Sequence, residues 1–229
     1  MLNFNSLFAL SSSHNPVEVC ADLLRHKLPI FSHPYIDDAL RGDAEAAIDL
    51  SVTDNSLRPL VLLCLYAVCR DSAGFKAAFS DIWAHDGPLV LRAISAPLLS
   101  DMFMLGGVRP EWQGPVTVYR GGQGGIDVVR RGWSWTTQRG VAAWFATRYV
   151  TIGEPVVVEA TVSSMRIVHV CDERNEHEVV IPRGVLRAMV SGTLDEWRME
   201  GAARHTTVTG ISEQVSTLLP SCVASTMAP

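Results

Sequence analysis

Apolar residues recur at helical spacing through the first hundred residues of the chain. The stretch at 15–28 places Asn15 at an N-cap and Pro16 at the first helical position, which is typical of a helix start. Its apolar side chains fall on one helical face: Val17, Cys20, Ala21, Leu24 and Leu28. Comparable patterns predict further helices within 36–50, from Ser56 onward, around 75–83 and over 88–105. In the last of these, Pro97 breaks or kinks the helix.

The pattern changes after the Gly- and Pro-bearing stretch at 106–115, which is the clearest boundary in the chain. Beyond it, short β-branched segments predict strands at 116–119, 133–136, 155–162, 166–170 and 178–181. One amphipathic helix, with Thr136 or Thr137 as its cap, interrupts them and carries on one face Ala142, Phe145, Ala146 and Tyr149. The expected fold class is α+β, with a helical N-terminal region at 1–111, a β-rich core at 112–200 and a loose C-terminal tail at 201–229.

The composition indicates a globular protein. Of the 229 residues, 48% are hydrophobic and 19% are charged. No segment approaches about 18 uninterrupted apolar residues, so we expect no membrane-spanning helix. The N-terminal residues lack the basic and long apolar regions of a signal peptide, and the five scattered cysteines indicate reduced thiols. We expect a cytoplasmic protein, or one delivered into a target cell's cytoplasm without a cleaved signal peptide.

Charge is unevenly distributed along the chain. The net charge is −5, yet residues 112–150 contain five arginines and a single acid, Asp127. A basic segment in an acidic protein suits a bound polyphosphate or a nucleic acid. The alternative is a set of arginines that simply face solvent.

Two acids, Glu176 and Glu178, are separated by one residue. On a strand, such side chains project from the same face while His177 points away. Neighbouring carboxylates repel each other, but they suit chemistry at a sugar anomeric carbon, where one stabilises an oxocarbenium-like centre and the other handles a proton. The alternative is an edge strand whose acids face solvent.

Two further segments carry polar groups that suit a dinucleotide. Arg120 ends a predicted strand and precedes two glycines, the first of them Gly121, so a pyrophosphate can approach both the guanidinium and the backbone. In the strand at 133–136, the hydroxyls of Ser134 and Thr136 face one side and two indoles face the other. The alternatives are a surface salt bridge for the arginine and solvent-facing hydroxyls on a half-buried strand.

In their order and spacing, these segments resemble the ADP-ribosyltransferase superfamily, in its cholera-toxin-like branch with an Arg–Ser–Glu (R-S-E) pattern. The matching motifs are Tyr-Arg-Gly at 119–121, Ser-Trp-Thr at 134–136, Ala-Ala-Trp-Phe-Ala at 142–146 and Asn-Glu-His-Glu at 175–178. The resemblance covers about 116–182, and Trp135 departs from the small residue usual at the centre of the second motif. The fold that it implies for 112–200 is a split antiparallel β-sheet core of ADP-ribosyltransferase type.

The resemblance implies a mono-ADP-ribosyltransferase that uses NAD⁺ as its substrate and needs no metal. Glu178 would hydrogen-bond the nicotinamide ribose and stabilise the oxocarbenium ion, and Glu176 would orient or deprotonate the acceptor. Arg120 would hold the phosphates or ribose, and the NAD⁺-binding residues would be Arg120, Gly121, Ser134, Thr136 and Phe145. The presence of both acids implies transfer to a macromolecule, with protein arginine as the leading acceptor and RNA or DNA as the second.

The resemblance also implies a bacterial or phage toxin or effector, with a cognate antitoxin or inhibitor as a further partner. Two other functions stay open: an NAD⁺ glycohydrolase on the same scaffold and a catalytically inactive binding module. Other motifs are incomplete. The Gly-rich stretch after 119 is followed by a turn and a strand rather than by a helix of the length that a Rossmann loop needs, and the Ser134 segment lacks the second glycine of a hydrolase elbow. A zinc site at His169, Cys171 and His177 lacks a fourth ligand.

Overall fold

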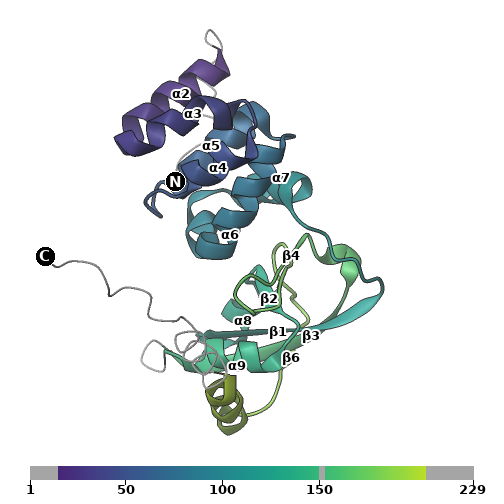
Figure 1. Cartoon of the computed structure of the whole chain (residues 1–229). Coiled ribbons are helices and arrows are strands. Elements are labelled where there is room, and N and C mark those ends of the chain that lie inside the picture. Colours follow the sequence, from purple (N-terminus) through teal and green to yellow (C-terminus); the bar gives the residue numbers. More distant parts are fainter. Residues whose placement is uncertain (1–14, 150–152, 205–229) are drawn as a thin grey trace, which may run out of the picture. The chain divides into compact units, whose positions relative to one another are not determined.

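The computed structural model describes residues 15–149 and 153–204, which divide into two compact units (Figure 1). Unit 1 contains Met1–Gly114 together with Ser163–Arg183, and unit 2 contains Pro115–Val162 together with Gly184–Pro229. The α+β class and the helical N-terminal region are confirmed. The division differs from the expected one, because residues 163–183 group with the helical region rather than with the rest of the 112–200 segment.

The described part of unit 1 begins with helices that pack along their apolar faces. They are α2 (Pro16–Lys27), α3 (His33–Leu40), α4 (Ala44–Ser51), α5 (Arg58–Cys69), α6 (Ala73–Ala93) and α7 (Ala96–Gly106), with a 3₁₀ turn η2 (Ile30–Ser32). The predicted start of α2 is confirmed, since the Asn15 side chain accepts a hydrogen bond from the Val17 N–H at 3.1 Å. Helix α6 packs against α4, α5 and α7.

Several helix boundaries differ from the expected ones for local reasons. The predicted helix at 36–50 is two helices, because Gly42 adopts a left-handed backbone with φ +94° and ends α3. Helix α6 runs through Pro88 with a kink at Asp86, which has non-helical dihedrals. Pro97 lies in the first turn of α7, where its missing N–H removes no helical hydrogen bond.

A β-hairpin completes unit 1. Strands β4 (His169–Cys171) and β5 (Glu178–Val180) pair antiparallel, with Cys171 opposite Glu178, and the 3₁₀ turn η3 (Ser164–Arg166) precedes them. The hairpin is hydrogen-bonded to the chain that follows α7. Val170 N–H donates to Val108 O at 2.8 Å, and Val108 N–H donates to His169 Nδ1 at 3.0 Å. The hairpin and the helices therefore belong to one packed body.

His169 is fully buried, and this burial lowers its pKa from near 6.5 to about 4. In the unfolded chain the imidazole takes up a proton as the pH falls through 6.5, whereas the folded chain keeps it neutral down to about 4. The contribution of His169 to the free energy of unfolding is therefore fully present above pH 6.5. It declines as the pH falls from 6.5 to 4, by about 3 kcal/mol at most.

We expect the pH dependence of unfolding to weaken in a His169→Asn variant, because the amide oxygen takes the place of Nδ1 as the acceptor for Val108 but does not titrate over this range. The measurement is the urea midpoint at pH 7 and at pH 4.5. His26→Asn is the control, since it removes an exposed histidine of the same unit and should leave the wild-type difference unchanged. An equal pH dependence in the two variants would contradict the assignment to His169.

Unit 2 contains strands that are covered by a helix. Its elements are β1 (Pro115–Gln123), α8 (Gly125–Val129), β2 (Ser134–Thr136), α9 (Arg139–Thr147), β3 (Pro155–Ser163) and β6 (Met189–Val190), followed by helical residues 194–204. The strands lie in the order β2-β1-β3-β6. Strands β1 and β2 pair antiparallel with Tyr119 opposite Thr136, and β3 pairs antiparallel with β6.

The core of unit 2 forms where α9 packs on β1. It consists of small or flat side chains: Ala142, Ala143, Ala146, Val157 and Trp197. The expectation of a loose tail from Gly201 is wrong for residues 201–204, which continue the helix that carries Trp197. The rest of the predicted tail, 205–229, lies outside the described residues.

Two further expectations concern the whole chain. Over residues 15–149 and 153–204, the structure contains no helix with the length and apolar character that crossing a membrane requires. The same residues contain no cluster of three or more His, Cys, Asp or Glu side chains arranged to hold a metal ion.

Candidate functional site

Arg120 lies inside β1 rather than at its end, because the strand continues through Gln123. Its side chain is half-buried, and Nη1 donates a hydrogen bond to the carbonyl oxygen of Ser134 on the neighbouring strand. The guanidinium lies against Gly132, where an added Cβ would overlap its atoms. A backbone carbonyl and a glycine that sequence reasoning did not select therefore fix the direction of this arginine.

Gly121 faces α9. A Cβ at this position would overlap the backbone carbonyl of Ala142, and the Ala146 nitrogen would lie 2.9 Å away. The close approach of helix and strand therefore requires a glycine here. This packing accounts for the residue without a ligand, and the assignment of Gly121 to NAD⁺ binding stays a prediction.

Strand β2 presents less polar surface than expected. Both indoles are buried, and Trp135 Nε1 donates to Gly132 O at 2.8 Å. Thr136 is also buried, and its hydroxyl oxygen accepts a hydrogen bond from Gln138 N–H at 3.0 Å. Thr136 thus supports the turn before α9, whose N-cap is Gln138, and the predicted Thr136 or Thr137 cap is shifted by one or two residues. Ser134 is half-buried, so part of the predicted hydroxyl face remains accessible.

Phe145 is half-buried on α9 and packs edge-on against Trp144, with ring centroids 4.9 Å apart. The Arg148 guanidinium lies 4.3 Å from the Phe145 ring centroid and 4.6 Å from that of Trp144. Tyr149, predicted to share the apolar face of this helix, lies beyond its end and is exposed. An open groove of about 710 Å³ begins here. Its lining includes Arg148, Tyr149 and Arg198.

Glu178 is the first residue of β5 and is half-buried. Its Oε2 accepts a hydrogen bond from Trp83 Nε1 at 3.2 Å. Trp83 lies on α6, 95 positions earlier in the chain. Sequence reasoning placed this tryptophan only among the apolar residues of a helix, because nothing local distinguishes a core indole from one whose N–H meets a distant carboxylate.

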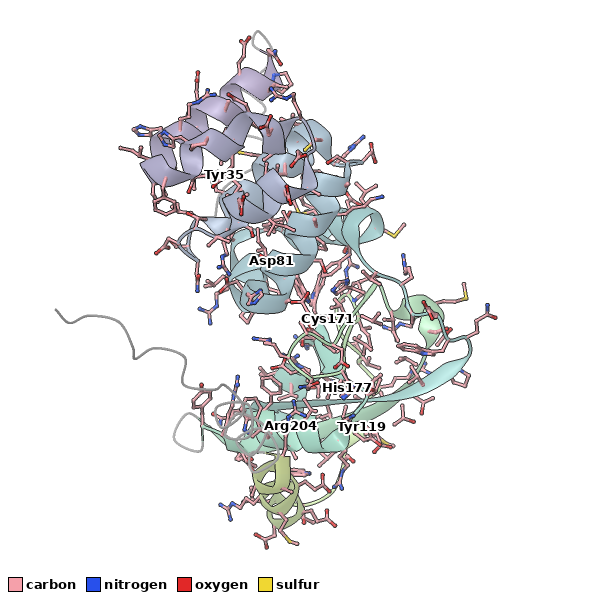
Figure 2. The ribbon with its side chains drawn as sticks, in the orientation of Figure 1. Tyr35, Asp81, Tyr119, Cys171, His177 and Arg204 are labelled. Carbon is pink, nitrogen blue, oxygen red and sulfur yellow. The ribbon has the colours of Figure 1, made fainter. Side chains whose placement is uncertain are left out.

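The expectation that Glu176 and Glu178 occupy one strand is wrong. Glu176 and His177 precede β5, and His177 has a left-handed backbone with φ 45°. The alternation of side chains along a strand requires an extended backbone, including at the residue between the two acids. Because His177 is not extended, alternation does not place the Glu176 and Glu178 side chains on one face. Figure 2 shows the side chains of this loop and labels His177, together with Cys171, which lies opposite Glu178 in the hairpin.

The loop that carries Glu176 is closed by its own polar groups. Asp172 Oδ1 accepts from His177 N–H at 3.0 Å, and its carbonyl accepts from Asn175 N–H at 3.0 Å. Glu176 forms an ion pair with Arg174 at 3.0 Å, and its side chain is only 17% exposed. The loop therefore holds this acid beside a guanidinium.

The arginines of the basic segment are largely engaged within unit 2. Arg130 pairs with Asp127 at 2.5 Å, and Arg139 pairs with Glu196 at 3.4 Å and with Glu200. Part of the positive charge seen in the sequence is therefore neutralised by Asp127 within the basic segment and by Glu196 and Glu200 beyond it.

The structure brings the predicted site residues together in two groups. Arg120, Gly121, Ser134, Thr136 and Phe145 belong to unit 2, and Glu176 and Glu178 belong to unit 1. Convergence of both groups on one dinucleotide stays a prediction.

Comparisons of the chain with protein-family models, with curated proteins and with solved structures found no match. The functional conclusion therefore depends on the residues themselves and on the geometry within each unit.

Proposed function

We propose that the chain is a mono-ADP-ribosyltransferase that transfers ADP-ribose from NAD⁺ to a macromolecule, with arginine on a protein as the acceptor. The observation that carries this proposal is the Glu178 carboxylate, which a buried indole holds in place two residues from a second acid. A fixed negative charge of this kind stabilises the positive charge that develops at a ribose C1′ when nicotinamide departs.

The reaction needs no general acid. Breaking the bond between C1′ and the pyridinium nitrogen sends the electron pair to nicotinamide, which leaves as a neutral molecule. Glu178 stabilises the oxocarbenium ion, the acceptor nitrogen attacks C1′, and Glu176 takes the proton that the acceptor loses. Arg120, directed by the Ser134 carbonyl and backed by Gly132, binds the NAD⁺ phosphates or ribose.

The ion pair of Glu176 supports arginine as the acceptor. Arg174 presents a guanidinium to this carboxylate at 3.0 Å, which is the group that an arginine acceptor would present. The Arg174 side chain is half-exposed, so an incoming arginine can replace it. For a nucleic-acid acceptor, the supporting observation is the groove with Arg148 and exposed Tyr149, since such groups bind single strands by charge and stacking.

The test is incubation of the protein with NAD⁺ labelled in its adenylate part and with whole-cell lysate. We expect a labelled macromolecule that loses its label to protease and keeps it after nuclease treatment. Label that survives protease and is lost to nuclease would contradict the protein acceptor and favour RNA or DNA. Nicotinamide release without a labelled macromolecule would favour a glycohydrolase, and unchanged NAD⁺ would favour an inactive binding module.

A further inference from the structure

A hydrogen bond joins the helical region to the proposed catalytic acid. Trp83 Nε1 on α6 donates to Glu178 Oε2 on β5 at 3.2 Å, and both residues belong to unit 1. A buried indole commonly finds an acceptor for its N–H, usually a backbone carbonyl. Here the acceptor is a carboxylate, and a hydrogen bond to a charged group is stronger than one to a neutral group.

Aromatic packing fixes the position of this indole. Trp83 is 3% exposed and meets Phe103 of α7 edge-on, with ring centroids 4.7 Å apart at 78°. Phe103 in turn meets Phe79 edge-on at 4.8 Å. Gly87, one turn after Trp83, also borders the ring, and a Cβ there would be in ordinary contact with Cε2 at 3.4 Å. A side chain enclosed in this way presents its N–H in one direction.

The backbone of the hairpin is anchored to the same region. Besides the bonds from Val108 to the β4 strand, the Arg109 guanidinium donates to Ile167 O at 2.9 Å. Strand β5, which carries Glu178, is tied to the segment that follows α7 through its pairing with β4. The helical region thus adds one direct contact to the acid itself, from the Trp83 indole.

We propose that Trp83 is a positioning residue for catalysis, which makes the helical region part of the catalytic apparatus. Its indole N–H fixes the orientation of the Glu178 carboxylate toward the ribose. This inference rests on the proposed function, because the role exists only if Glu178 acts on NAD⁺. A tryptophan that serves packing alone would contribute to stability and leave the rate of the chemical step unchanged in a folded variant.

The kinetic test is Trp83→Phe, which keeps an aromatic ring at the site and removes the N–H. We expect kcat for nicotinamide release to fall about 10- to 100-fold, with KM for NAD⁺ within about threefold of wild type. Trp112→Phe is the matched control, since Trp112 is an exposed tryptophan of the same unit and should retain wild-type kinetics. In a Glu178→Gln background, Trp83→Phe should cause no further loss, whereas a general folding defect would lower both rates.

A structural readout separates this inference from the proposed function. In a ¹H–¹⁵N spectrum, the indole N–H signal that Trp83→Phe removes should shift in Glu178→Gln and stay in place in Glu176→Gln. Wild-type kcat in a folded Trp83→Phe variant would overturn the inference and leave the proposed function standing. If the wild-type chain releases no nicotinamide, the proposed function fails and the role of Trp83 fails with it, whatever the indole signal does.

Discussion

A Glu178→Gln variant is expected to release nicotinamide from NAD⁺ about 100- to 1,000-fold more slowly than the wild-type chain. The amide has the shape of the carboxylate and can still accept the Trp83 N–H, but it carries no negative charge to stabilise the ribose cation. The measurement is the initial rate of nicotinamide release at saturating NAD⁺, with thermal unfolding to show that the variant is folded.

Two other acids, Glu173 and Glu176 in the loop before β5, provide comparison variants for this prediction. Glu173→Gln removes an exposed acid and should retain wild-type rates. Glu176→Gln should retain most nicotinamide release and lose transfer to the acceptor, since the proposed role of Glu176 begins after the glycosidic bond breaks. A Glu178→Gln variant with wild-type turnover would refute the assigned role and direct attention to another acid.

A Gly121→Ala variant is expected to lose more than about 3 kcal/mol of folding stability in unit 2, because its Cβ would overlap the carbonyl of Ala142 where α9 packs on β1. Neither partner can move alone, since the overlapping atom is helix backbone and the glycine lies within a paired strand. The measurement is the denaturant midpoint, followed by Trp197 fluorescence in a background in which the other five tryptophans are replaced by Phe.

The control for this substitution is Gly140→Ala in α9, the helix that packs on Gly121. A Cβ at Gly140 meets only the Glu200 carbonyl, at 3.9 Å, and alanine favours the helix by up to about 1 kcal/mol. This variant should match or exceed the wild-type stability. If Gly121→Ala unfolds at the same denaturant concentration as Gly140→Ala, the tight contact between α9 and β1 does not exist.

The features that the sequence predicts well are those that neighbouring residues determine. The start of α2 depends on Asn15 and Pro16, and both act within one turn. The break near Pro97 follows from its missing N–H. In each case the relevant partners lie within about four positions, so the pattern contains the information.

The features that the sequence does not predict depend on partners far along the chain or on backbone shape. The alternation argument for Glu176 and Glu178 assumed an extended backbone, and the left-handed residue between them removes that premise. The position of Gly121 after Arg120 predicts room for a ligand, whereas the structure places α9 against it, and this helix begins 18 residues further along the chain. Trp83 carries no local sign of its partner, since the hydrogen bond forms only when α6 and the hairpin pack together.

The attachment of the hairpin to the segment after α7 has a practical consequence for shortened forms of the chain. A fragment that starts at residue 112 contains every residue of the Arg–Ser–Glu motif, and the motif alone would recommend it as a minimal enzyme. Such a fragment lacks the Trp83 indole and the backbone of Val108, so Glu178 would lose its indole donor and β4 would lose its hydrogen bonds to Val108. Truncation and fusion designs should therefore keep the helices and the motif on one polypeptide.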